Sequence, residues 1–413
     1  MNARIRMRSV RIAGFALAAL MLGNAPVHRA HLRIGSFGLH TGAGPLISGS
    51  RVLVEATGLQ GTFSLSLVGP GRIEGHDYIA PSVDRPQTAT LVASSSGTVA
   101  YGTVTIVPPP APRRALIAVA SYDDGIALHD ARSFALLGYA GIGGPAGDVA
   151  FGKNGDIFAA DTDGDILTAI KRNPWTVQRI AGVSEGNEIA VDARSGNVFV
   201  SDRDAGPTGA LTRITPEGDV MLVRTGNTAE GLTIDEARQL VYVGNVNEQS
   251  VAVVDARTMR LLRKLPSVNR TFGVALDPRR QRLYVVSNSS PGMNGKGGYV
   301  AEIDAGRVPR IVRRSAYFTF PLGIAFDAQH RRLFVTDEAK DMVYVLRDDT
   351  LAAARAPIRT CGTPWRPHIT GGLLFVPCAH DNRIDVLSLR TLRRVAGAPF
   401  ATGGFPLSVA SWP

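Results

Sequence analysis

One alternation of apolar and polar positions recurs through residues 115–413 of the chain. Each copy has a small or turn residue, an apolar pair, a polar turn, and then an aromatic-rich strand that ends near Asp or Asn. The copies are GDVAFGKNGDIFAAD from Gly147, NEIAVDARSGNVFVSD from Asn187, EGLTIDEARQLVYVGN from Glu230, FGVALDPRRQRLYVVSN from Phe272, LGIAFDAQHRRLFVTD from Leu322, a shorter PHITGGLLFVPC from Pro367 and a truncated PLSVASW from Pro406. Runs with a period of two residues predict β-strands, so we expect an all-β protein.

The residue just before each apolar pair, which we call the anchor, gives the repeat length. The anchors are Asp148, Glu188, Gly231, Gly273, Gly323, His368 and Ser408, spaced by 40, 43, 42, 50, 45 and 40 residues. A period of this size with several short strands indicates the blades of a β-propeller. The last copy supplies only an inner strand, and the segment from Ala115 supplies only outer strands. We therefore expect the two ends to complete a seventh blade together and close the ring.

The repeat resembles a known family. The segments VYVGNVNEQSVAVVDARTMRLLRKL (241–265) and GVALDPRRQRLYVVSN (273–288) are similar to the YVTN repeat of bacterial seven-bladed β-propellers. The resemblance covers about residues 115–413 and implies a seven-bladed propeller closed by N- and C-terminal strands. It does not imply one activity, because propellers of this superfamily include binding proteins and enzymes.

A different pattern precedes the repeats. Residues 31–107 contain short alternating strands, and the stretch GRIEGHDYIAPSVDRPQTATLVAS resembles bacterial immunoglobulin-like domains. The resemblance implies a small β-sandwich. The sequence PPPAPRR at 108–114 is typical of a stiff linker between this domain and the propeller at 115–413.

Residues 1–30 have the features of an export signal: a basic start followed by a short apolar run at 12–23. Removing them removes five Arg, so the formal net charge of +10 falls by five, to +5. We expect an exported, periplasmic or extracellular monomer with no membrane-spanning segment after signal removal. The remaining basic residues form no run of the kind that binds nucleic acid.

The two cysteines, Cys361 and Cys378, lie in one repeat. In an exported protein such a pair favours a disulfide. Cys361 precedes the inner strand at 367–370, and Cys378 ends the next, antiparallel strand, so the chain returns to the same end of the blade. We expect a bridge; two separate buried thiols are the alternative.

Basic and acidic residues occur in different types of turn. If the strands of a blade are labelled A (innermost) to D, the A–B and C–D turns share one face, and the B–C turns lie on the other. The first face holds Lys153, Arg194, Arg238, Arg257, Arg279, Arg280, Arg282, Arg331 and Arg332; the B–C face holds Asp123, Asp124, Asp161, Asp163, Asp165, Asp202, Asp204, Glu248, Asp337, Glu338, Asp341 and Asp381. An acidic B–C face would attract a cationic or basic ligand, peptide or protein. Alternatively, Asp and Arg simply suit these turns.

The anchor ring is the main candidate site, because we expect it to open into the central channel on the acidic face. Candidate ligand-binding residues are Asp148, Asn187, Glu188, Glu230, Arg366 and His368. Glu188, Glu230 and Asp148 could hold a divalent cation such as calcium. EGLTID, which begins at Glu230, is faintly similar to a metal-bearing segment of gluconolactonase and regucalcin-like propellers. Polar side chains solvated in a wet channel are the alternative.

These observations leave the activity open. The sequence has no G-x-S-x-G, H-E-x-x-H, P-loop or C-x-x-C motif. We therefore expect a non-catalytic binding or scaffold protein without an assigned catalytic residue or cofactor. The alternative is a metal-dependent, lactonase-like hydrolase with the ion in the channel. A third reading is a lyase that uses His368 as a general base, as in streptogramin-lyase-like propellers.

Overall fold

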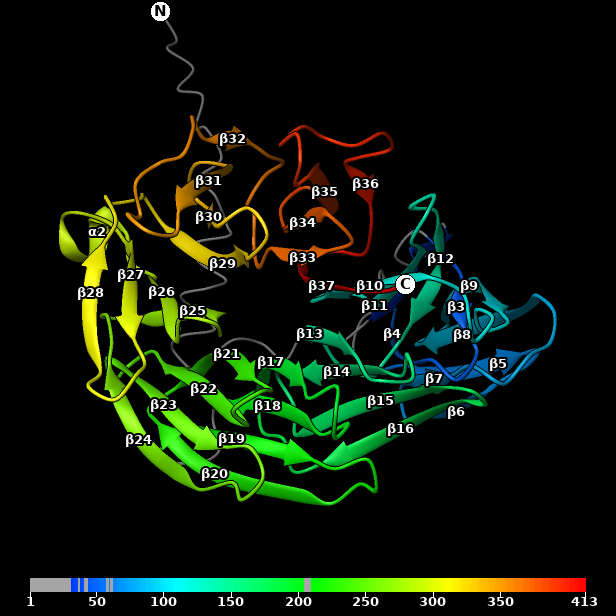
Figure 1. Ribbon diagram of the computed structural model, residues 1–413. Helices are drawn as coiled ribbons and strands as arrows, with labels where there is room; N and C mark the ends of the chain where they lie inside the picture. Colours follow the sequence, from blue (N-terminus) through cyan, green and yellow to red (C-terminus); the bar gives the residue numbers. More distant parts are fainter. Residues whose placement is uncertain (1–30, 36–37, 41–43, 57–58, 60–61, 204–208) are drawn as a thin grey trace, which may run out of the picture.

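The protein is described by a computed structural model that covers residues 31–35, 38–40, 44–56, 59, 62–203 and 209–413; the expected export signal lies outside these residues. Figure 1 shows β-sheets arranged around a common centre. Within the described residues, six sheets have four strands in chain order. Their strands are β13 (Ala146–Phe151), β14 (Ile157–Asp161), β15 (Ile166–Arg172), β16 (Trp175–Ala181); β17 (Gly186–Val191), β18 (Val198–Asp202), β19 (Gly209–Ile214), β20 (Val220–Gly226); β21 (Ala229–Asp235), β22 (Leu240–Asn245), β23 (Ser250–Asp255), β24 (Leu261–Pro266); β25 (Thr271–Asp277), β26 (Arg282–Ser287), β27 (Tyr299–Asp304), β28 (Arg310–Arg314); β29 (Pro321–Asp327), β30 (Arg332–Asp337), β31 (Met342–Arg347), β32 (Ile358–Arg359); β33 (His368–Thr370), β34 (Leu373–Cys378), β35 (Arg383–Ser388) and β36 (Phe400–Ala401).

Burial follows the position of a strand within its sheet. All five residues of β18 are buried, whereas β16 at the outer edge alternates between half-buried and exposed positions. The apolar runs at the strand centres therefore pack on both faces, and the outermost strands meet solvent. This pattern is consistent with the expected propeller, in which neighbouring sheets pack face to face.

The two ends of the repeat region meet in one sheet, as predicted. The C-terminal strand β37 (Pro406–Trp412) pairs antiparallel with β10 (Leu116–Ser121), with Val409 opposite Val119. Strands β11 (Gly125–Asp130) and β12 (Leu136–Ala140) continue this sheet outward. The inner strand from one end and the outer strands from the other close the ring without a free inner edge (Figure 1).

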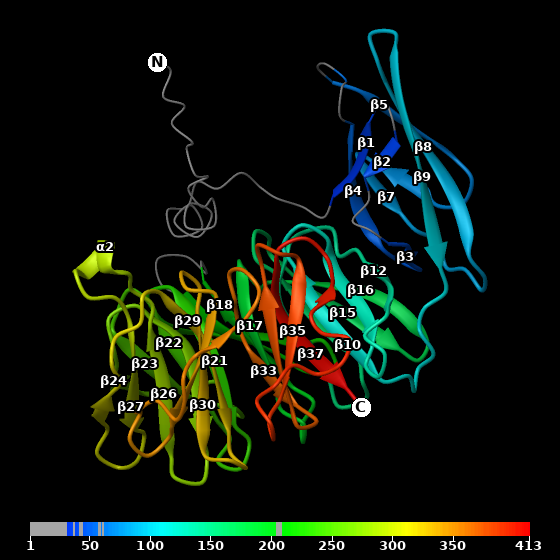
Figure 2. The same ribbon diagram turned by 90° about the horizontal axis from the view of Figure 1, so that it is seen from above.

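The N-terminal segment forms a smaller β-structure beside the ring (Figure 2). One five-stranded sheet has the order β2-β1-β4-β7-β6. The other strands, β3, β9, β8 and β5, extend the sheet that closes the ring, because β3 pairs parallel with β12. The bounds are β1 (His31–Gly35), β2 (Gly38–His40), β3 (Leu46–Ile47), β4 (Arg51–Ala56), β5 (Ser64–Val68), β6 (Arg72–Glu74), β7 (Asp77–Ile79), β8 (Gln87–Ser95) and β9 (Thr98–Val107).

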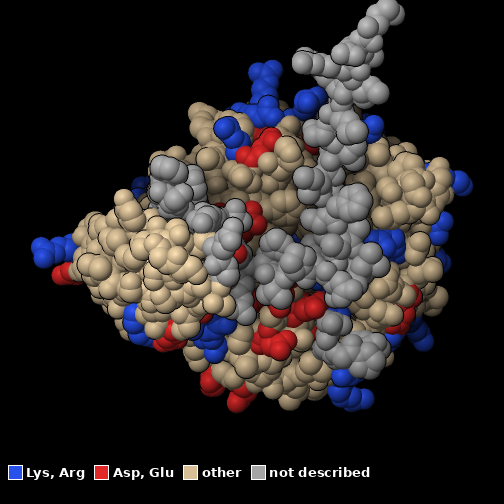
Figure 3. All heavy atoms as spheres, turned by 180° about the vertical axis from the view of Figure 1, so that it is seen from behind, with Lys and Arg blue, Asp and Glu red and all other residues tan. Residues whose placement is uncertain are grey.

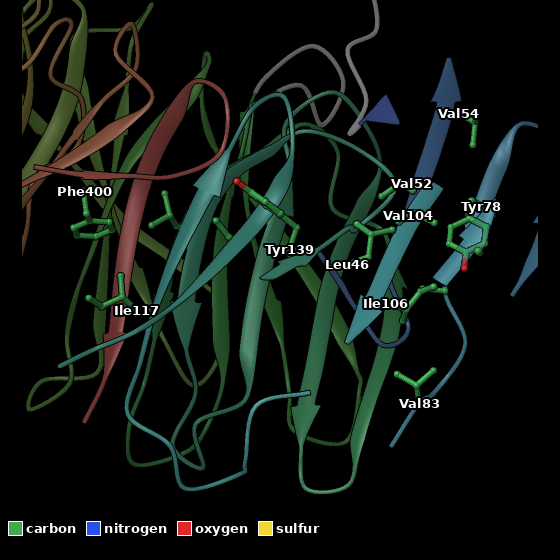
Figure 4. Packing of buried hydrophobic residues seen from close by; sticks show 14 of the residues in the cluster. Leu46, Val52, Val54, Tyr78, Val83, Val104, Ile106, Ile117, Tyr139 and Phe400 are labelled. Carbon is green, nitrogen blue, oxygen red and sulfur yellow. The ribbon is translucent and has the colours of Figure 1, made fainter. Parts of the chain in front are cut away.

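A single apolar cluster runs from this segment into the ring. Figure 4 shows Leu46, Tyr78 and Ile106 packed on one side, with Tyr139 and Phe400 on the ring side. Polar contacts add to the joint: the indole N–H of Trp175 in β16 donates to the Ser48 carbonyl at 2.8 Å. The N-terminal segment is thus joined to the ring by a shared sheet and a shared core.

The Pro-rich stretch at 108–114 is held by one buried side chain. The guanidinium of Arg172, at the end of β15, donates from Nη2 to the carbonyls of Ala111 at 3.0 Å and Arg114 at 2.8 Å. Arg172 is only 2% exposed. The Pro-rich stretch therefore lies against the ring.

The predicted disulfide is present. Cys361 and Cys378 are bonded, with their Cα atoms 5.6 Å apart. The predicted strands on either side are also confirmed, since β33 and β34 pair antiparallel and Cys378 ends β34. The bridge ties the loop before the inner strand of this sheet to its second strand.

We expect the Cys361→Ser, Cys378→Ser double variant to unfold with a free energy lower by about 3 kcal/mol, because the bridge closes a loop of sequence separation 17. Denaturant unfolding of both proteins measures this difference. Thiol titration of denatured, unreduced wild-type protein should find no free cysteine, and two free thiols would refute the bridge.

Replacing Arg172 by Ala should release the linker and lower the free energy of unfolding by roughly 3 kcal/mol, since two hydrogen bonds from a buried charged donor are lost. Limited proteolysis with trypsin should then cut faster after the exposed Arg113 and Arg114. Lys171→Ala, which changes a partly exposed neighbour, is the control and should leave the cleavage rate unchanged.

Candidate functional site

A cavity of about 380 Å³ lies at the centre of the ring, between the innermost strands. Six of the seven anchors line it: Asp148, Glu188, Gly273, Gly323, His368 and Ser408. From the anchors the cavity follows the inner strands toward their carboxyl ends, where Phe151 and Ser411 contribute to its wall. It therefore extends toward the A–B face, and not toward the B–C face where the sequence analysis expected the site to open.

The B–C side of the anchors is packed with apolar side chains. Phe272, Leu322, Trp365 and Leu407 belong to one buried cluster, and none is more than 4% exposed. Each lies within three residues of an anchor, at or near the start of an inner strand. This packing occupies the position where a channel mouth was predicted.

Three consecutive anchors connect neighbouring blades through hydrogen bonds. Ser408 Oγ accepts from the backbone N–H of Val149 at 3.2 Å. Asp148 Oδ2 accepts from the N–H of Ile189 at 2.7 Å, and Glu188 Oε2 accepts from the N–H of Leu232 at 2.6 Å. In every case the donor is the residue that directly follows the anchor of the neighbouring blade. With His368, the preceding anchor, these side chains form one polar arc of the ring.

The other three anchors are glycines, and there the backbones approach closely. A Cβ on Gly231 would lie 1.9 Å from the carbonyl oxygen of Phe272 in the next blade. A Cβ on Gly273 would lie 2.9 Å from the Leu322 carbonyl oxygen, and one on Gly323 would lie 2.5 Å from Pro367. Glycine is therefore required by close contact in this arc, and these three anchors add no side chain to the cavity wall.

Arg366 reaches from the loop before β33 across the ring. Its Nε pairs with Glu188 Oε1 at 2.9 Å, and its Nη2 donates to Asn187 Oδ1 at 2.7 Å. Its Nη1 donates to the carbonyls of Gly147 and Asn187, each at 3.2 Å. Glu230 Oε2 lies 3.8 Å from Nη2. One guanidinium thus contacts three other sheets, and each of its nitrogens already faces a protein oxygen.

Burial changes the ionisation of the polar arc. Loss of solvation raises the pKa of Glu188 to about 8; Arg366 opposes this shift and the Asp148 carboxylate adds to it. Burial likewise raises the pKa of Asp148, although Arg366, Ser408 and two backbone N–H groups favour its ionised form. These carboxyl groups therefore keep a proton more readily than they would in water.

His368 differs from the rest of the polar arc. Burial lowers the pKa of its imidazole to about 4, so the ring is neutral near pH 7. It lines the cavity, yet among the described residues no side chain is hydrogen-bonded to it. A general base needs a pKa near the working pH and an orienting partner, and His368 has neither here.

The donor set does not fit a divalent cation. Glu188 and Glu230 face the guanidinium of Arg366. Asp148 Oδ2 and Glu188 Oε2 each already accept a hydrogen bond from a backbone N–H group. An ion between the carboxylates would lie against a fixed positive charge. In the part of the chain that the structure describes, no three His, Cys, Asp or Glu side chains are grouped to hold a metal ion.

The six predicted ligand-binding residues, Arg366 among them, lie together in or beside the cavity. Asp148, Glu188, His368 and Arg366 line the cavity itself. Asn187 and Glu230 lie on its B–C side; Glu230, 1% exposed, also pairs with Arg203 at 3.5 Å. What sequence reasoning missed is that Arg366 is the centre of the group. The available signal was a single basic residue, Arg366, two positions before an anchor in a repeat whose other copies supply two acidic anchors, Asp148 and Glu188.

The acidic turns of the B–C face have structural partners. Asp337 accepts from the backbone N–H of Thr319 at 2.8 Å, Asp381 from that of Gly362 at 2.8 Å, and Asp202 from that of Ser184 at 3.1 Å. These carboxylates hold the connections that lead into the inner strands; Asp204 lies outside the described residues. Figure 3 shows this face with acidic side chains around its centre and Lys and Arg mostly toward its edge.

The basic turns of the A–B face are neutralised locally. Arg238 pairs with Asp235 at 2.9 Å, Arg280 with Asp277 at 2.7 Å, and Arg332 with Asp327 at 3.0 Å. In each blade the aspartate ends the inner strand. Counting only the basic residues overstated the positive charge of this face, because their partners lie in the same turns.

The remaining candidates are turns and loops. DTDGD at 161–165 connects β14 to β15, as a hairpin turn was expected to do. The longer loop between β26 and β27 contains one short helix, α2 (Pro291–Asn294), with Met293 exposed. No helix in the described residues is both long and apolar enough to cross a membrane.

The chain was compared with known proteins. No protein-family model matches the sequence, and no curated protein matches it by sequence. Solved structures with the same fold are β-propeller proteins. They include a putative 6-phosphogluconolactonase from Bacteroides uniformis (TM-score 0.59, 11% identity, 72% of this chain and 99% of that chain). The periplasmic gluconolactonase of Pseudomonas aeruginosa is similar (0.58, 12%, 72% and 98%), as is hydrazine synthase of Kuenenia stuttgartiensis (0.56, 13%, 74% and 93%). At these identities the similarity shows the propeller fold alone.

Glu188→Gln should flatten the dependence of stability on pH. A carboxyl whose pKa rises from 4.5 to about 8 on folding contributes stability below pH 4.5 that is lost as the pH rises through 8. The variant cannot ionise, so its stability relative to wild type should grow by roughly 1–4 kcal/mol between pH 5 and 9. Denaturant unfolding at several pH values measures this, with the exposed Glu217→Gln as control. A difference that stays constant with pH would contradict the assignment.

Proposed function

We propose that this chain is an exported, non-catalytic binding protein whose ligand enters the central cavity of the ring. The observation that carries the proposal is the position of Arg366. Its guanidinium pairs with Glu188 and lies 3.8 Å from Glu230, at the position where the hydrolase alternative places a channel ion. The carboxylates then serve to hold the blades together, and the cavity beside them remains available for a ligand. Its volume of about 380 Å³ falls within the range of small-molecule pockets.

The hydrolase and lyase readings have weaker support. A lactonase-like mechanism would need a metal to polarise the carbonyl or activate water, and the donor set around Arg366 does not fit one. The lyase reading needs His368 as a base, and its lowered pKa of about 4 makes it a poor one. Similarity to lactonase structures supports the fold and leaves the activity of this chain open.

The finer architecture is part of the same proposal. Six four-stranded sheets and the inner four strands of the closing sheet give seven blades. The two packed sheets at the N-terminus form an immunoglobulin-like domain over residues 31–107. Export to the periplasm or the exterior is supported by the disulfide, which persists in oxidising compartments. We infer a monomer. A protein or peptide partner at the acidic B–C face stays a prediction, and the packed mouth supports a small ligand in the cavity instead.

Removing the guanidinium tests the central assignment. Arg366→Met should lower the free energy of unfolding by about 3–5 kcal/mol, because it leaves buried carboxylates without counter-charge. Calcium should then raise the melting temperature of this variant, since the ion can replace the lost charge, and should leave the wild type unchanged. Arg307→Met, at an exposed position, is the control and should respond to neither change.

The opposite result would support the hydrolase. Wild-type protein that binds calcium with one-to-one stoichiometry, hydrolyses a lactone or ester, and loses both properties in Glu188→Gln would overturn the proposal. Calorimetry with calcium and an assay of lactone opening distinguish the two cases on the same preparation.

A further inference from the structure

The cavity has a chemical bias that narrows its ligand. We propose that it binds a small organic ammonium ion, which enters from the A–B face and directs its charged nitrogen to the polar arc. This inference rests on the proposed binding function and specifies its ligand class. It follows from three features of the cavity: the balance of hydrogen-bond donors and acceptors, the balance of charge, and the distribution of space.

Acceptors outnumber free donors among the side chains of the cavity. The donors of Arg366 already face protein oxygens, so a ligand gains little from this residue. The carboxylates of Asp148 and Glu188 keep lone pairs, because each oxygen has two acceptor sites and receives few bonds. The neutral His368 ring has a lone pair without a described partner. An ammonium group, which has only donors, complements this set.

The charged groups of the cavity wall also favour a cationic ligand. The cavity wall holds two carboxyl groups, Asp148 and Glu188, and one guanidinium, Arg366. Glu230 lies just behind the wall, 3.8 Å from Arg366, and has a second cationic partner in Arg203 at 3.5 Å. A cationic ligand would favour the ionised forms of Asp148 and Glu188, whose pKa values burial raises, whereas an anion would hold both groups in their protonated forms. The sign of the ligand is therefore positive.

The space suits an organic ion better than a bare metal. Gly273 and Gly323 of the glycine arc line the cavity opposite the polar arc and add no polar side chain to its wall. The wall also carries one aliphatic side chain from each of six blades. These are Val149, Ile189, Leu232, Val274, Ile324 and Val409. A compact hydrocarbon body can lie against them while its ammonium group reaches Asp148, Ser408 and His368.

A set of matched probes tests the ligand class. Binding of 4-fluorobenzylamine, 4-fluorobenzyl alcohol and 4-fluorobenzoate to the full chain is measured by fluorine NMR line broadening at pH 7. The three share a ring and a size and differ in charge. We expect the amine to bind at least tenfold more tightly than the alcohol, and the benzoate to show no binding. Equal binding of amine and alcohol, preference for benzoate, or no binding by any probe would overturn the ammonium assignment.

Variants locate the binding site. Asp148→Asn should weaken the amine at least tenfold and leave the alcohol unchanged; the exposed Asp84→Asn is its matched control. Since Asp148 also bridges two blades, a second variant guards against misfolding. Ala150→Trp places a large side chain in the cavity wall and should abolish binding of every probe, whereas Ala354→Trp at an exposed turn should not. Amine binding that survives Ala150→Trp would place the ion elsewhere and refute the proposal.

The test distinguishes failure of the ammonium assignment from failure of the proposed binding function. If the alcohol or the benzoate binds in the cavity and Ala150→Trp removes it, the ammonium class is wrong and the binding protein stands. If calcium binds and a lactone is hydrolysed, the binding protein itself is wrong.

Discussion

The structure depends on one buried cation. Arg366 extends from the loop before β33 and contacts two backbone carbonyls, one side-chain amide and two carboxylates, which belong to β13, β17 and β21. These partners lie up to 219 residues away in sequence. A guanidinium removed from water must have its charge and its donors satisfied, so the residues facing it cannot vary independently. This requirement explains why acidic anchors occur on one side of the ring.

The ring uses two different solutions where neighbouring blades meet. In the polar arc, side chains of Ser408, Asp148 and Glu188 span the gap to the next backbone. In the glycine arc no side chain fits, because the backbones themselves are in contact at Gly231 and Gly273. The first solution places polar groups around the cavity, and the second brings neighbouring backbones into direct contact. The cavity therefore arises from the closure of the ring, without an inserted loop or a separate pocket.

Local features of the sequence were predicted well, and contacts across the ring were not. The period-two runs located the strands, and the half-blades at both ends predicted the pairing of β37 with β10. The disulfide followed from the return of the chain within one repeat. The contacts of Arg366 could not be derived, because they depend on the curvature that brings distant blades together. The contact between the N-terminal segment and the ring was also missed: it depends on β3, a strand of two residues, and on the buried Arg172, neither of which leaves a periodic signal.

The repeat distinguishes residues that every blade needs from residues that occur in one blade only. The aspartates that end the inner strands recur from blade to blade, and each pairs with its own turn or a neighbouring arginine, as at Asp235, Asp277 and Asp327. A residue that serves the blade must appear wherever the blade is repeated. His368 and Arg366 occur once each in their positions, so the repeat does not require them. Arg366 is accounted for by the charges that it neutralises. His368, which lines the cavity and has no hydrogen-bond partner among the described residues, is available to contact the proposed ligand.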